Sequence, residues 1–198
     1  MPSTDALSRQ DRATLLEVAR TSIRHGLEHG QALAVNPDDY PEALRPPRAT
    51  FVTLEIEGQL RGCIGTLAAH QPLVRDVAEH AHAAAFADPR FPEVATKEFP
   101  RLDVHISVLS PAEPLHFDSE ESLLEQLRPG VDGLTLQFRG HRATFLPAVW
   151  DSLPDPYVFL AQLKQKAGLP LNFWSPELRA ERYTTDYFGD ADVTGSAR

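Results

Sequence analysis

The chain contains one cysteine, Cys63, in the segment 60–65, which reads Leu-Arg-Gly-Cys-Ile-Gly. A deprotonated thiol is a strong nucleophile, and the nearby guanidinium of Arg61 would favour the thiolate over the thiol. The glycines on either side of Cys63 allow unusual main-chain conformations, or a close approach of a ligand to the main chain. The segment therefore indicates a reactive thiol in a site that attracts anions.

The same cysteine also has a structural interpretation. Free cysteine is among the residues most often buried in protein cores, where it packs as a small apolar side chain. Glycines within strands often mark a bend or a bulge and bind nothing. Both interpretations of Cys63 stay open at the level of the sequence.

A nucleophilic cysteine needs a base, and His105 is the best placed by its sequence pattern. In the stretch 102–108 apolar residues alternate with polar ones, so Asp103, His105 and Ser107 share one face of a strand. His105 then points away from the main apolar face. Cys63 and His105 are accordingly the hypothetical catalytic residues.

Several arginines offer a binding site for a small anion. Arg61, Arg75 and Arg90 could converge with the start of the predicted helix at Pro72, where unpaired N–H groups attract carboxylate or phosphate. Scattered, solvated arginines are the other interpretation, since arginine is usually exposed. On the first interpretation we expect these ligand-binding residues: Arg61, Gly62, Ile64, Gly65, Thr66, Asp88 and Arg90.

The sequence predicts no metal site and no cofactor. One cysteine can form neither an intramolecular disulfide nor a cysteine zinc cluster. His80 and His82 stand two apart on a predicted helix, so their side chains diverge by about 200° and a solvated helix surface is the expected position. The remaining histidines show no ligand spacing, and the phosphate-loop and dinucleotide-binding patterns are absent.

Periodicity predicts the elements that position these residues. Apolar spacing and capping residues predict helices over 9–29, from Pro72 to Phe86, over 118–127 and from Pro156 to Ala167. Alternation and turn residues predict strands over 51–56, 59–64, 102–108, 134–138, 143–145 and 182–188. Glu57-Gly58 and Arg139-Gly140 join four of these strands into two hairpins.

The order of these elements predicts the fold class. Helices and strands follow one another without strict alternation, which favours an α+β fold with a largely antiparallel sheet. A length of 198 residues fits one domain with two lobes. We expect a tail over 1–8, the two-lobed domain over 9–188 and a flexible tail over 189–198.

The charge of the chain excludes some classes of partner. Asp and Glu outnumber Lys and Arg by 28 to 19, for a net charge of -9, which disfavours binding to a phosphate backbone. The N-terminus lacks a signal-peptide pattern, and no apolar stretch reaches the roughly 18 residues of a membrane span. We therefore expect a cytoplasmic protein that binds no membrane.

The segment 60–67, which continues as Thr-Leu, resembles the signature of the AMMECR domain family, whose bacterial members are called AmmeMemoRadiSam system protein A. Other segments resemble family motifs in the same order: 51–54, Asp88 to Phe91, 106–111, 145–147 and 166–169. The similarity extends over residues 10 to 188. The eight-residue signature is highly specific, and the other segments support it.

The resemblance implies a two-lobed α+β domain, in which a largely antiparallel sheet is flanked by helices and the signature lies near a cleft between the lobes. It also implies an association with a MEMO-type protein, related to dioxygenases, and with a radical SAM protein. It supplies no reaction. Family members often carry Glu where this chain has His105, so a Cys-His pair is not implied as a family mechanism.

Two functions of different classes follow. The first is an accessory component that acts with the MEMO-type and radical SAM proteins and binds a small anionic ligand or a modified side chain at the signature. The alternative is a thiol-dependent enzyme that uses Cys63 as nucleophile and His105 as base. A nucleic-acid-associated regulatory module is a distant third, because of the acidic charge.

Overall fold

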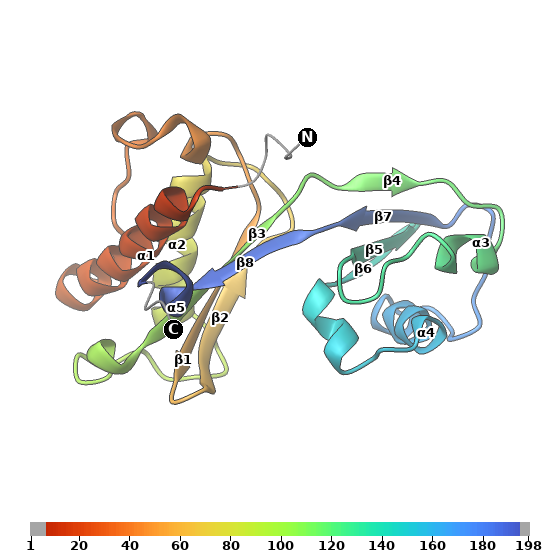
Figure 1. Cartoon of the computed structure of the whole chain (residues 1–198). Coiled ribbons are helices and arrows are strands. Elements are labelled where there is room, and N and C mark those ends of the chain that lie inside the picture. The colour runs from red at the N-terminus through yellow and green to blue at the C-terminus, as the bar shows by residue number, and fades with distance from the viewer. Residues whose placement is uncertain (1–6, 195–198) are drawn as a thin grey trace. The chain divides into compact units, whose positions relative to one another are not determined.

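The computed structural model describes residues 7–194 and confirms an α+β fold (Figure 1). The chain divides into two compact units. Unit 1 comprises Met1–Leu109 and Asp186–Arg198, and unit 2 comprises Ser110–Thr185. Within residues 7–194 each unit contains one four-stranded sheet, and the prediction of largely antiparallel pairing is confirmed.

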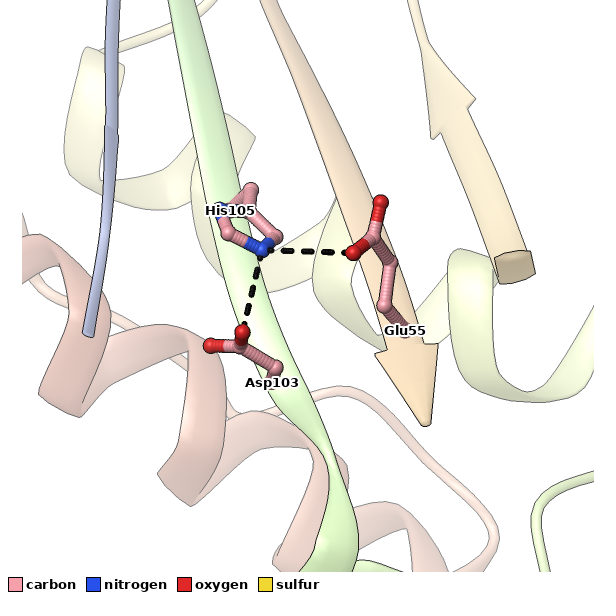
Figure 2. A group of neighbouring side chains, drawn as sticks. All are labelled: Glu55, Asp103 and His105. Atoms are coloured by element: carbon pink, nitrogen blue, oxygen red, sulfur yellow. Dashed lines mark ion pairs between the residues drawn. The ribbon is translucent and has the colours of Figure 1, made fainter. Parts of the chain in front are cut away.

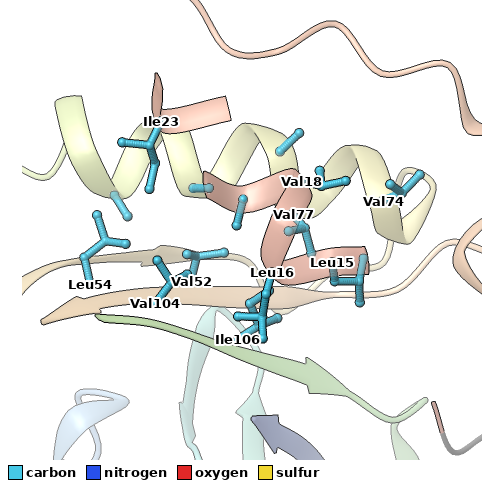
Figure 3. Close-up of a cluster of buried hydrophobic side chains, with 14 of the residues drawn as sticks. Leu15, Leu16, Val18, Ile23, Val52, Leu54, Val74, Val77, Val104 and Ile106 are labelled. Carbon is cyan, nitrogen blue, oxygen red and sulfur yellow. The ribbon is translucent and has the colours of Figure 1, made fainter. Parts of the chain in front are cut away.

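Unit 1 is a sheet with two long helices packed on one face. The strand order is β2 (Gln59–Gly65), β1 (Thr50–Ile56), β3 (Asp103–Leu109) and β8 (Thr185–Gly189). The helices α1 (Arg9–His29) and α2 (Leu73–Phe86) cover the face to which the apolar strand residues point (Figure 3). The opposite face of the sheet carries the polar strand residues, among them His105.

The core of unit 1 lies between the helices and the sheet (Figure 3). Ile23 of α1 and Val77 of α2 pack over Val52, Leu54 and Ile106 of the strands, and all five side chains are fully buried. Burial of each such side chain contributes roughly 1.5–3 kcal/mol. Alternate residues of β1 and β3 therefore point to the helices, and the residues between them point the other way.

Local signals explain where the long helices begin and end. Ser8 and Asp11 form a reciprocal capping box at the start of α1, and Gly30 ends the helix with a left-handed φ of 71°. The predicted bounds of α1 are therefore confirmed. Pro72 was predicted to be the first helical residue of α2. It is instead the N-cap residue, and the helix begins at Leu73.

Unit 2 is a smaller sheet covered by short helices. The strand order is β4 (Glu113–Leu115), β7 (Arg179–Tyr183), β5 (Gly133–Phe138) and β6 (His141–Phe145). The helices are α3 (Glu120–Leu124) and α4 (Pro156–Lys166), with the 3-10 helix η4 (Pro147–Asp151) between them in sequence. In the core, Trp150 stacks on Phe159 and donates a 2.7 Å hydrogen bond to the carbonyl oxygen of Asp132.

Three predicted elements differ in the structure. The single strand predicted over 182–188 is two strands, β7 and β8, because Thr184 pairs with Ser110 and so interrupts both ladders. The helix predicted over 118–127 is shorter in the structure, where α3 contains only Glu120–Leu124. The tail expected from residue 189 begins as helix α5 (Asp190–Thr194), which is held because Asp190 accepts hydrogen bonds from Arg20 and from the main-chain N–H of Val104.

The rest of the predicted tails is only partly described. Leu7 packs against the core of unit 1, and Ser8 caps α1. Residues 1–6 and 195–198 lie outside the described residues. Within 7–194, no helix combines the length and the apolar character needed to cross a lipid bilayer.

Candidate functional site

The signature segment lies on β2, the second strand of a hairpin. Glu57 and Gly58 adopt φ values of 54° and 73°, as expected for a tight turn that matches the twist of its strands. Thr53 of β1 pairs with Cys63, and the register shifts between Leu54 and Glu55, so Arg61 is the extra residue of a β-bulge. The bulge turns Arg61 away from the regular alternation of the strand.

The two signature glycines allow close packing. A Cβ atom on Gly62 would lie 2.1 Å from the carbonyl oxygen of Ala84, so β2 packs directly on the main chain of α2. A Cβ on Gly65 would lie 2.3 Å from the carbonyl oxygen of Thr50. Ile64, between them, packs against the core of unit 1. These three residues of the predicted ligand site therefore have a structural role.

Asp88 connects the main chain of Cys63 to Arg90. Its carboxylate accepts a 2.9 Å hydrogen bond from the N–H of Cys63 and is held by Arg90 through Nε at 3.0 Å and Nη2 at 2.7 Å. Nη2 also donates to the carbonyl oxygen of Cys63 at 3.3 Å. The Arg90 bonds, followed by the Cys63 N–H, hold the pKa of Asp88 well below its usual range. Three predicted site residues are thus brought together.

Arg61 binds a different segment of the chain. Its guanidinium donates two hydrogen bonds to Glu98, at 2.9 and 3.0 Å, and two more to the carbonyl oxygens of Pro92 and Glu93. Every nitrogen of this guanidinium therefore has an acceptor within the protein. An external anion at Arg61 would have to displace Glu98, a residue that the sequence did not indicate.

The pairing of Glu98 predicts a specific acid sensitivity. Hydrogen bonds from Arg61 and from the N–H of Ala95 lower the pKa of Glu98 from 4.5 to about 2. Because the folded pKa lies below the unfolded one, the ionised carboxylate stabilises the fold above about pH 4.5 and this stabilisation is lost as the pH falls to about 2. Urea titrations over this range should show a smaller fall in unfolding free energy for Glu98→Gln than for the wild type.

The control for this experiment is Glu125→Gln, at an exposed glutamate of unit 2. Its unfolding free energy should fall with acid as steeply as that of the wild type. If Glu98→Gln showed the same acid dependence as this control, the pairing of Arg61 with Glu98 would not contribute to stability.

The hypothetical catalytic pair shares one face of the sheet without contact. The sulfur of Cys63 accepts a 3.2 Å hydrogen bond from the hydroxyl of Thr53, and Thr53 pairs on its other side with His105. Cys63 and His105 are therefore two strands apart, a separation of about 10 Å. Neither ring nitrogen of His105 makes a hydrogen bond to any residue from 7 to 194, so the structure does not join the two side chains.

Thr66 and Arg75, the remaining candidates, contact the protein itself. The N–H of Thr66 donates to the carbonyl oxygen of Thr50 at 3.0 Å, and its hydroxyl accepts from the N–H of Ala68 at 3.2 Å. Arg75 donates to the carbonyl oxygen of Val35 at 3.3 Å. Neither is joined to Cys63 by these bonds.

The solvated position predicted for His80 is wrong. His80 packs inward from α2, with Nδ1 3.1 Å from a carboxylate oxygen of the buried Asp76, which also accepts from Thr50 at 2.6 Å. Burial would raise the pKa of Asp76, but hydrogen bonds from His80, Thr50 and Gln71 outweigh it and keep the pKa low. The sequence contained a signal for this pair, because residues four apart on one helix, such as Asp76 and His80, lie next to each other.

Comparisons with known proteins show which sequences and structures this chain is similar to. The sequence model of the AMMECR1 family matches residues 16–188. A protein of Methanothermobacter thermautotrophicus is 40% identical over 188 residues, which cover 92% of this chain and 95% of that protein. Protein MJ0810 of Methanocaldococcus jannaschii is 34% identical, over 80% and 81% of the two chains.

A solved structure has the same fold. The crystal structure of the uncharacterized protein PH0010 from Pyrococcus horikoshii matches with a TM-score of 0.79 and 32% sequence identity. The match covers 93% of each chain. The match therefore includes residues of both units.

Proposed function

Because the chain belongs to the AMMECR1 family, we propose that it is an accessory component that acts with a MEMO-type protein and a radical SAM protein. Its signature segment would bind a small anionic ligand or a modified side chain presented by these partners. The family resemblance supports the choice of partners, and the hydrogen bonds around Cys63 support the choice of site.

The proposed ligand site rests mainly on the position of Arg90. Its side chain is 56% exposed, and two of its nitrogens are fixed by Asp88. Its third nitrogen, Nη1, makes no hydrogen bond within the described part of the chain, so one oriented cationic donor stays available beside the carbonyl of Cys63. Guanidinium groups held in this way bind carboxylate and phosphate well, because little side-chain freedom is lost.

Partner binding by an Arg90→Gln variant tests the proposal. We expect the amount of MEMO-type and radical SAM protein of the same genome that co-purifies with the variant to fall by roughly tenfold or more. A fall of this size is typical when one partner of a charged contact is removed. Arg128→Gln is the matched control, because Arg128 is 55% exposed and pairs with the buried Asp132 in the same way. Equal capture of partners by the two variants would contradict the proposed site.

A Cys63→Ser variant separates this function from a thiol-dependent enzyme. The specific observation that favours the enzyme is that Cys63 is partly exposed and that its sulfur accepts a hydrogen bond from the Thr53 hydroxyl. As an accessory component, the variant should keep both partner binding and pathway output. Loss of output with intact partner binding would favour Cys63 as a nucleophile.

A further inference from the structure

Three side chains with metal-binding atoms converge on the face of the unit 1 sheet opposite the helices (Figure 2). Glu55 extends from β1, and Asp103 and His105 extend from β3. Nε2 of His105 lies 3.3 Å from Oδ2 of Asp103 and 3.7 Å from Oε2 of Glu55. One ligand atom from each residue lies within 4.8 Å of the other two.

The side chain of His105 is only 17% exposed. Both ring nitrogens are shielded from solvent, and within residues 7–194 neither makes a hydrogen bond. An unpaired buried polar group costs about 1–3 kcal/mol. The two carboxylates are close enough to His105 for ion pairing, yet neither forms a hydrogen bond with its ring nitrogens. The three groups thus surround a common point.

The cluster also carries uncompensated negative charge. Glu55 and Asp103 stand directly opposite each other on β1 and β3, a position in which like charges destabilise a sheet. Neither carboxylate pairs with a lysine or arginine in the part of the chain that the structure describes. A cation between the two carboxylates would offset this repulsion.

The ring of His105 is held in a fixed orientation by β8. Tyr187 stacks on it, with the ring centroids 5.4 Å apart and the planes 6° from parallel. A Cβ atom on Gly189 would lie 2.4 Å from Nδ1, so the main chain of β8 packs against that edge of the ring. Nε2 is consequently the nitrogen that faces the carboxylates.

We propose that Glu55, Asp103 and His105 bind a divalent first-row transition metal ion such as Zn²⁺. Two atoms that each lie about 2.0–2.1 Å from a tetrahedral ion are about 3.3 Å apart, close to the distances around Nε2. An imidazole with two carboxylates selects such an ion over Ca²⁺ and Mg²⁺, which take oxygen ligands. Three protein ligands fill three of the four positions around a tetrahedral ion and leave the fourth for water.

Zinc uptake by the tag-free full chain, stripped of metal with a chelator, tests the site. His25 and His29 stand one turn apart on α1 with ring centroids 4.5 Å apart, and such a pair chelates zinc by itself, so every sample carries His29→Ala. Equilibrium dialysis followed by metal analysis should then show one Zn²⁺ per chain. Zn²⁺ should also raise the melting temperature, because the three proposed ligands are brought together only in the folded state.

Substitutions of the carboxylates identify the ligands. Glu55→Gln and Asp103→Asn should each weaken Zn²⁺ binding by roughly tenfold or more. The side chains of Glu55 and Asp103 are 31% and 50% exposed, so the fold should tolerate the changes, and circular dichroism verifies this. Glu57→Gln, at the neighbouring exposed glutamate, is the matched control. It should bind Zn²⁺ as tightly as the parent protein, which carries His29→Ala alone. The proposal is overturned if the parent takes up no stoichiometric Zn²⁺, or if both carboxylate variants bind as tightly as the control.

Discussion

Alanine in place of Gly62 is expected to reduce the free energy of unfolding by about 3 kcal/mol, the upper end of the usual range for overpacking. The added methyl group would lie 2.1 Å from the carbonyl oxygen of Ala84. This neighbour belongs to the main chain of α2 and cannot rotate away as a side chain could. Either β2 or α2 must therefore shift. Urea denaturation at equilibrium measures the loss.

Gly140→Ala is the control for Gly62→Ala. Gly140 lies in the turn between β5 and β6, and a Cβ atom there would meet no atom within 4 Å. Its unfolding free energy should stay within about 0.5 kcal/mol of the wild type. If the two alanine variants were equally stable, close packing would not be the reason for glycine at position 62.

The local features of unit 1 could be predicted from the sequence because short-range physics determines them. The capping box of Ser8 and Asp11 and the left-handed Gly30 define α1 from within the helix itself. The Glu57-Gly58 turn likewise determines the hairpin that carries Cys63. Each of these signals acts over a few residues, so the local sequence contains all of it.

The partners of the site residues could not be predicted, because they are distant in sequence. Arg61 is held by Glu98, which lies 37 positions later in the chain. Alternation along β3 correctly placed His105 on the polar face of its strand. The strand order β2-β1-β3, which no local pattern specifies, inserts Thr53 between His105 and Cys63.

The proposed metal cluster illustrates the same limit. Asp103 and His105 share a face of one strand, which the alternation showed. Glu55 joins them only through the register of β1 against β3, which pairs Glu55 with Asp103. The expectation of no metal site considered ligand spacing along the chain, and a cluster built across two strands has no such spacing.

The second large effect is expected at an ion pair of unit 2 in which the lysine is buried and the glutamate is partly exposed. Lys164 of α4 is fully buried, and its ammonium group contacts the carboxylate of Glu120 at the start of α3. Glu120→Gln should lower the unfolding free energy by about 3 kcal/mol, because a buried charge would lose its counter-charge. Glu121→Gln, at the exposed next residue of α3, is the matched control and should change it by less than about 0.5 kcal/mol.

Removal of both charges should restore most of this stability. In a Glu120→Gln, Lys164→Met double variant, the methionine places an apolar chain of similar length at the fully buried position 164 of α4. The double variant should therefore unfold at a higher urea concentration than Glu120→Gln alone, and the double-mutant cycle should give a coupling of about 2 kcal/mol. Purely additive effects would show that α3 and α4 are held together by apolar packing and not by this pair.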